Sequence, residues 1–147
     1  MFYELVYNSV AVPADLAEAE LDKILASARA RNLEMGITGL LLFHRGEFVQ
    51  LLEGKRAEVE TVFHDVIVKD RRHRAVAVCW DQPISHRNFK DWSMGFARLS
   101  DLDAHQSPGL KGYLAGGVDA LDLSGPASTG RKLLLAIYGQ FQAPAAA

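Results

Sequence analysis

One glutamine stands in a stretch of apolar residues and raises the first chemical question. The stretch GEFVQLLEG, residues 46–54, has the composition of a β-strand, and alternate side chains of a strand share a face. Gln50 therefore shares its face with Phe48 and Leu52, which both favour a protein core. A buried amide without a hydrogen-bond partner costs about 1–3 kcal/mol. We therefore expect a polar group from another part of the chain to meet Gln50.

Tyr7 is the first candidate for that partner. It lies in the strand-like stretch LVYNS and shares a strand face with Leu5. Buried tyrosines commonly need one hydrogen-bond partner, and the amide of Gln50 can serve. Taken alone, such a pair also has a structural interpretation, in which two buried polar groups satisfy each other.

Four further residues could take part in a site, and each also has a structural interpretation. Asn32 falls near the predicted end of a helix, where asparagine tolerates left-handed geometry. His73 stands in the basic stretch DRRHR and fits a solvated loop. Trp92 and Met94 fit ordinary packing positions.

The composition limits the class of protein. The chain has 147 residues, of which 49% are apolar and 23% are charged, as in an ordinary globular domain. Its net charge of −2 argues against broad attraction to nucleic acid or to a membrane surface. No apolar run approaches the roughly 20 residues of a membrane span, and the first residues do not resemble a signal peptide. The cytoplasm is therefore the predicted location.

The cysteine and histidine content limits the chemistry further. Cys79 is the single cysteine, which excludes an internal disulfide, and its apolar neighbours in AVAVCW predict a buried thiol. The five histidines lack the spacing of a metal site, so no metal is expected. The sequence also lacks a Gly-rich phosphate loop.

The apolar spacing predicts the order β-α-β-β-α-β, followed by a fifth strand. Strands are expected at residues 2–9, 37–43, 47–53, 74–80 and 93–99, helices at 14–31 and 55–70, and a short helical turn at 85–92. This order is the ferredoxin-like pattern of an α+β protein, with both helices on one face of a mixed sheet. The first and third strands then lie side by side at the centre and carry Tyr7 and Gln50 under the helices. The fifth strand is expected to flank the first.

The C-terminal tail has its own composition. Gly, Pro and Ser interrupt it at SPG, AGG and SGPASTG, and RKLLLAIYGQF then predicts a helix near residues 131–141. The sheet face opposite the two helices carries apolar side chains such as Val6 and Leu51, so this helix is predicted to cover that face. The alternative is an output or oligomerisation element. We divide the chain into a domain at residues 1–99 and a tail at residues 100–147.

Four stretches, in this order and at these separations, resemble the BLUF family of blue-light sensors, which use a flavin. They are LVYNS, ARARNLEMGITGLLLFHRGEFVQLLEG, KDRRH and FKDWSMGF. The resemblance covers about residues 2–99, and the block that contains Asn32 and Gln50 is its most specific part. The chain resembles the short, single-domain type, because the 48 residues after the fifth strand are too few for a cyclase or phosphodiesterase domain.

The resemblance implies an FAD cofactor, with FMN as the alternative, whose ring lies between the two helices. It implies that Tyr7 donates an electron and a proton, and that Gln50 bridges the phenol and the N5 and C4-carbonyl edge of the flavin. Asn32 would hold the C4-carbonyl and N3 edge. An amide both donates and accepts, so Gln50 could change between two bonding states. Trp92 or Met94 would then pass the change on.

The other implied flavin contacts form an apolar set and a polar set. The apolar contacts to the ring are Ile24, Ile67, Leu41 and Phe48. The contacts to the ribityl and phosphate groups are Arg31, Arg72 and His73. Val66 departs from the pattern, because some family members carry a basic residue at this position of the second helix.

Three functions fit these residues to different degrees. The first is a blue-light photoreceptor that is not itself an enzyme, binds neither nucleic acid nor membrane, and signals through a partner protein or a homo-oligomer. The second is a flavin-dependent redox protein, which would need an open substrate site where Tyr7 and Gln50 are expected. The third is a ferredoxin-like interaction module without flavin, which the joint presence of Tyr7, Asn32 and Gln50 argues against.

Overall fold

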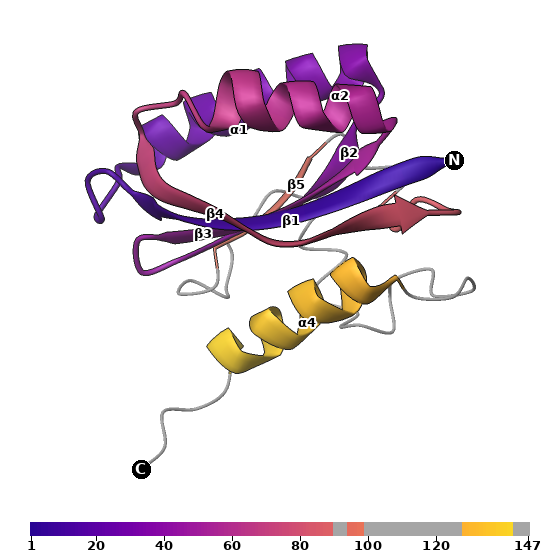
Figure 1. The fold of residues 1–147 in the computed structure, drawn as a ribbon. Helices are drawn as coiled ribbons and strands as arrows, with labels where there is room; N and C mark the ends of the chain where they lie inside the picture. Colours follow the sequence, from indigo (N-terminus) through magenta and orange to yellow (C-terminus); the bar gives the residue numbers. More distant parts are fainter. Residues whose placement is uncertain (90–93, 99–127, 143–147) are drawn as a thin grey trace.

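The computed structural model describes residues 1–89, 94–98 and 128–142, which form a five-stranded sheet with helices on both faces (Figure 1). The elements are β1 (Phe2–Ala11), α1 (Glu18–Met35), β2 (Thr38–His44), β3 (Glu47–Gly54), α2 (Arg56–Thr61), η1 (Val62–Ile67), β4 (His73–Ile84), β5 (Gly95–Arg98) and α4 (Thr129–Gln142). Helices α1 and α2 cover one face, and α4 lies on the other (Figure 1). None of the described helices is long and apolar enough to cross a membrane.

The sheet has the strand order β4-β1-β3-β2-β5, which confirms the ferredoxin-like prediction for the first four strands. β1 pairs antiparallel with β3, and Tyr7 lies directly opposite Gln50 in this pairing. β5 pairs parallel with β2, so the sheet is mixed, as predicted. The register of the two central strands therefore brings the phenol and the amide together.

Two tight turns fix the ends of the elements that carry the polar residues. The β2–β3 hairpin turns at Arg45 and Gly46, with φ of 48° and 81°. Positive φ at both central residues is the geometry that matches the twist of paired strands. α1 ends at Met35, and Gly36 caps it with a φ of 68° and a backbone N–H that donates to the carbonyl of Asn32.

Apolar side chains fill both layers of the fold. The core between the sheet and the two helices includes the buried residues Leu5, Leu21, Leu25, Leu52 and Val59. On the other face, Val6, Leu51 and Leu134 are each fully buried. The tail helix therefore covers the sheet, as predicted.

The predicted helix boundaries need correction. The first helix was predicted from residue 14 to residue 31, but α1 begins at Glu18 and continues to Met35. Leu16 is buried although it precedes the helix. The second helix is shorter than predicted, and its second half is a π-helix. Apolar spacing identifies a buried face, but it contains no information on where a helix begins or which helical form it takes.

β4 is longer than predicted, because it runs through Pro83 to Ile84. Pro83 pairs with Tyr3 on β1, and β4 has no strand neighbour on its other side among the described residues. An edge strand tolerates proline because the outward N–H is not needed for pairing. The prediction of a buried Cys79 is wrong, since its thiol is exposed on this edge strand. Residues 85–89 form bends rather than the predicted helical turn.

The predicted neighbour of the fifth strand is also wrong. β5 lies beside β2, at the edge of the sheet opposite β4, and not beside the first strand. β1 already has β3 on one side and β4 on the other, so no pairing edge remains for β5. Residues 93 and 99, the ends of the predicted strand, lie outside the described residues, as does Trp92.

Candidate functional site

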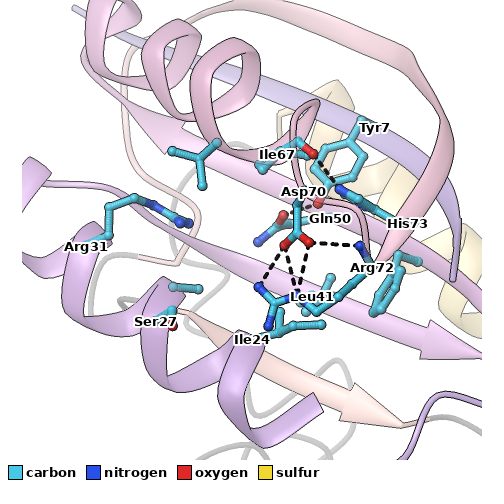
Figure 2. Close-up of a pocket in the computed structure, with 13 residues that line it drawn as sticks. Tyr7, Ile24, Ser27, Arg31, Leu41, Gln50, Ile67, Asp70, Arg72 and His73 are labelled. Atoms are coloured by element: carbon cyan, nitrogen blue, oxygen red, sulfur yellow. Dashed lines mark hydrogen bonds and ion pairs between the residues drawn. The ribbon is translucent and has the colours of Figure 1, made fainter. Parts of the chain in front are cut away.

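A pocket lies between α1, the π-helix η1 and the sheet (Figure 2). The predicted site residues that line it are Tyr7, Ile24, Arg31, Leu41, Phe48, Gln50, Ile67, Arg72 and His73. Ser27, Ala28 and Asp70, which were not predicted, also line it, as does Val66, the position that departs from the family pattern. The pocket therefore gathers residues from four separate parts of the chain into one site.

The phenol and the amide form the polar centre of this pocket. Tyr7 and Gln50 are 3% and 4% exposed, and the Tyr7 hydroxyl donates a hydrogen bond to Gln50 Oε1. The other end of the amide, Nε2, donates to Met94 Sδ at 3.2 Å. Both ends of Gln50 are thus bonded, which accounts for an amide on an apolar strand face.

Burial strengthens the preference of the phenol for its protonated form. Desolvation raises the pKa of Tyr7 above its ordinary value, and the nearby charge of Arg31 only partly opposes this effect. The Tyr7 hydroxyl therefore keeps its proton at neutral pH. It is a hydrogen-bond donor and holds a proton that it could transfer.

Two apolar walls face each other across the pocket. Ile24 of α1 forms one wall and Ile67 of η1 forms the other. Leu41 and Phe48 come from the sheet and add apolar surface to the lining. The π-helical turn of η1 is unusual, and its backbone bonds include Val68 N–H to the carbonyl of Phe63 at 3.0 Å. Such turns frequently occur at functional sites. The space between these walls suits a flat apolar ring.

Asp70 and Arg72, which both line the pocket, form an ion pair (Figure 2). Arg72 Nη2 lies 2.8 Å from Asp70 Oδ2, and Arg72 Nε lies 3.0 Å from Asp70 Oδ1. Partial burial opposes ionisation of Asp70, but the hydrogen bonds and the charge of Arg72 outweigh it and lower the pKa of the carboxyl. Its position two residues before Arg72 was the available signal for this residue.

Arg31 provides a second cationic group in the pocket lining, and unlike Arg72 it forms no ion pair with Asp70. Its Nε is buried and has no hydrogen-bond partner among the described residues, and Nη2 lies 3.4 Å from Asn32 Oδ1. Desolvation lowers the pKa of Arg31 below its ordinary value. A buried donor without a partner is costly, so an acceptor on a bound molecule would stabilise this side chain.

His73 is bonded through both ring nitrogens. Nδ1 lies 2.9 Å from Ser9 Oγ, and Nε2 donates to the backbone carbonyl of Ile67. Because a carbonyl only accepts, Nε2 carries the hydrogen, and in the neutral ring Nδ1 accepts from Ser9. His73 thus joins β1 and the start of β4 to the end of η1, while its ring forms part of the pocket wall.

The remaining predicted residues lie at different distances from the pocket. Asn32 is fully buried near the end of α1, and its carbonyl accepts from Ile37 N–H at 2.8 Å, but it does not line the pocket. Met94 is buried against Gln50. Arg29 on α1 holds the Met94 carbonyl through Nε at 2.9 Å, a contact that the sequence did not reveal.

The family model and the most similar relatives all point to one protein family. The family described as sensors of blue-light using FAD, BLUF, matches residues 2–95. The blue light- and temperature-regulated antirepressor BluF of Escherichia coli is 28% identical over 106 residues, which cover 72% of this chain and 25% of that protein. The photoactivated adenylate cyclase subunit alpha of Euglena gracilis is 27% identical over 111 residues, 75% of this chain and 11% of that subunit. This chain therefore spans a quarter or less of the length of these two relatives.

Solved structures of similar length give the same result. The dark-state structure of BlrB, a BLUF protein, is 33% identical, covers 95% of this chain and 96% of that chain, and superposes with a TM-score of 0.65. The structure named BlrP1 BLUF is 29% identical, covers 94% and 90% of the two chains, and has a TM-score of 0.73. With the match over residues 2–95, these likenesses show that this chain belongs to the BLUF family of blue-light sensors that use FAD.

Proposed function

We propose that this blue-light sensor switches through a chain of hydrogen bonds from Tyr7 through Gln50 to Met94. The observation that carries the proposal is the double bonding of Gln50, whose Oε1 accepts from Tyr7 and whose Nε2 donates to Met94 Sδ. A side-chain amide carries an acceptor and a donor at its two ends, so rotation of the amide group by half a turn exchanges them. The switch would therefore be a rearrangement of Gln50.

The pocket fits the flavin of the family. Its walls Ile24 and Ile67 would lie on the two sides of the ring, and the unpartnered Nε of Arg31 would meet an acceptor of the cofactor. Arg72 would contribute less charge to phosphate binding, because Asp70 already neutralises it. When bound, FAD supplies a ring that absorbs blue light and accepts an electron in its excited state. The protonated phenol of Tyr7 is placed to release the electron and the proton of its O–H group.

Reversal of the Gln50 amide would change the environment of Met94. In the observed orientation, an N–H group points to Met94 Sδ, which is a weak acceptor. In the reversed orientation, an oxygen and a sulfur would face each other with no hydrogen between them. Because Met94 directly precedes β5 and its carbonyl is held by Arg29, the two amide orientations would favour different positions of this segment.

Purified protein loaded with FAD tests the photoreceptor function. We expect blue light to shift the flavin absorption to longer wavelength without bleaching, and we expect the shift to reverse in darkness. Absorption spectra before, during and after illumination measure this. A flavin-dependent redox protein would show no such reversible red shift under blue light, and a module without flavin would stay colourless.

We also propose that the tail conveys the output of a flavin-binding domain at residues 1–99. Support comes from α4, which lies on the sheet face opposite α1 and α2 (Figure 1) and buries Leu134 completely. The E. coli relative is named an antirepressor, and by analogy this chain would act on a partner protein. We further propose that it does so as a homo-oligomer in the cytoplasm.

Hydrogen exchange in darkness and under steady blue light tests this output route. We expect backbone amides of residues 85–89, of β5 and of α4 to exchange at different rates in the two conditions, because Met94 would lose one of its contacts. The core strand β3 serves as the internal reference. Identical rates in all three segments, in a protein whose flavin does respond to light, would contradict the proposed route.

A further inference from the structure

Two buried carboxylates lie on the sheet face that α4 covers. Glu4 on β1 and Glu53 on β3 are fully buried, and they occupy directly opposite positions of the antiparallel pair. Like charges directly opposite each other destabilise a sheet, and a buried charge needs hydrogen-bond partners. This carboxylate pair, Glu4 and Glu53, therefore depends on donors from other parts of the chain.

Glu4 receives five hydrogen bonds, two of them from the start of α4. The donors are Trp80 Nε1 (3.2 Å), Gln82 Nε2 (3.0 Å), Asn88 Nδ2 (3.3 Å), Ser128 Oγ (2.6 Å) and the backbone N–H of Gly130 (2.9 Å). Ser128 Oγ accepts from Arg131 N–H at 3.0 Å, so its own hydrogen points to Glu4. Ser128 thus caps the helix, and the first turn of α4 directs its free N–H groups toward negative charge.

Glu53 holds the segment that follows β4. The backbone N–H groups of Asn88 and Phe89 donate to it at 2.8 Å and 2.6 Å, and Asn88 Nδ2 donates at 3.0 Å. Thr38 Oγ1 adds a bond of 2.9 Å. The side-chain amide of Asn88 therefore bridges Glu4 and Glu53, and the two carboxylates share a donor.

We propose that Glu4 and Glu53 are positioning residues that couple residues 85–89 to the first turn of α4. If Asn88 moves, Glu4 loses one donor and faces Glu53 without the bridging N–H group, which weakens its hold on α4. Thermodynamic linkage makes the effect reciprocal. The proposal deepens the output step of the proposed function, because residues 85–89 lead toward Met94 and α4 is the proposed output element.

Gly130→Ala tests the coupling from the side of α4. A Cβ at this position would lie 2.6 Å from Glu4 Cδ and 2.7 Å from each of its carboxylate oxygens. Because five hydrogen bonds hold this carboxylate, either Glu4 or the first turn of α4 must move. Alanine favours a helix over glycine, so a loss of protection in α4 would not come from helix propensity.

Residue-resolved hydrogen exchange of the full chain with FAD, kept in darkness, is the measurement. In Gly130→Ala, the amides of residues 88, 89 and 130 are expected to exchange about fivefold faster or more, the ratio for losing roughly one hydrogen bond. The backbone amide of Leu51, whose side chain lies on the same sheet face, should keep its exchange rate. Thr129→Ala changes an exposed neighbour in the same turn and should alter none of these rates.

Faster exchange at residue 130 alone would show that Glu4 only docks α4, and this would overturn the coupling. Unchanged rates at all three amides would overturn it as well. If Leu51 also exchanges faster, the variant is globally destabilised, and Asn88→Ala then decides. That variant should accelerate exchange of the Gly130 amide and leave Leu51 unchanged, whereas an unchanged Gly130 amide would refute the proposal. Because the experiment is done in darkness, a flavin that fails to respond to light does not affect its outcome.

Discussion

Tyr7→Phe is expected to keep its FAD and to lose the light-induced red shift completely. The phenylalanine ring preserves the packing of Tyr7 against Phe63, whose ring centroid lies 5.6 Å away. The variant lacks the O–H group that we propose as the source of the electron and the proton, and Gln50 Oε1 loses its donor. Light-minus-dark absorption spectra of the variant and the wild type, at equal flavin occupancy, measure the effect.

Tyr3→Phe is the matched control for this experiment. Tyr3 is another buried tyrosine of β1, on the same strand face, but its hydroxyl bonds to Asp81 and it does not line the pocket. Burial raises the pKa of Tyr3 to about 12, so this phenol is also protonated at neutral pH. The control should show a red shift of wild-type size. A reversible red shift of that size in Tyr7→Phe would remove Tyr7 from its proposed role.

Gln50→Leu is expected to fold, to bind FAD and to show no downshift of the flavin carbonyl stretch on illumination. Leucine suits the buried face shared with Phe48 and Leu52, but it has no N–H group to donate to a carbonyl in either state. The Tyr7 hydroxyl loses its acceptor, so the free energy of unfolding should fall by about 1–3 kcal/mol. Infrared difference spectroscopy follows the carbonyl, and thermal unfolding of the variant follows its stability.

Met94→Leu separates the amide from its second partner in the same assay. It removes the sulfur acceptor of Gln50 Nε2 and leaves the bond between Tyr7 and Gln50 in place. The carbonyl downshift should therefore persist in this control. A downshift that survives in Gln50→Leu would show that the amide is not the switch.

The central part of the fold and of the site could be predicted from the sequence because it depends on periodicity. Alternation along β1 and β3 placed Tyr7 and Gln50 on one face, and the ferredoxin-like order made the two strands neighbours. Helical spacing placed Ile24 and Ile67 on the helices that cover that face. Side-chain periodicity is a local property of the sequence, and the order of the strands follows from the general rule that crossover connections are right-handed.

The features that could not be predicted depend on contacts between parts of the chain that are far apart in the sequence. The position of β5 follows from which sheet edge is free, and no feature of its own residues specifies that edge. Cys79 is exposed because β4 is an edge strand, although its apolar neighbours suggested a core. The role of Glu4 depends on partners that are remote in the sequence, such as Gly130, where spacing carries no signal.

The position of Tyr7 opposite Gln50 also determines how the receptor can fail. β1 is paired on both sides and so is β3, which leaves neither strand free to slip. A slip by one residue would turn every side chain of a strand to the other face, moving Leu5 and Leu52 out of the core together with Tyr7 and Gln50. Misalignment of Tyr7 and Gln50 is thus as costly as loss of the core. Errors of register should yield unfolded protein, removed by quality control, rather than folded receptors that signal falsely.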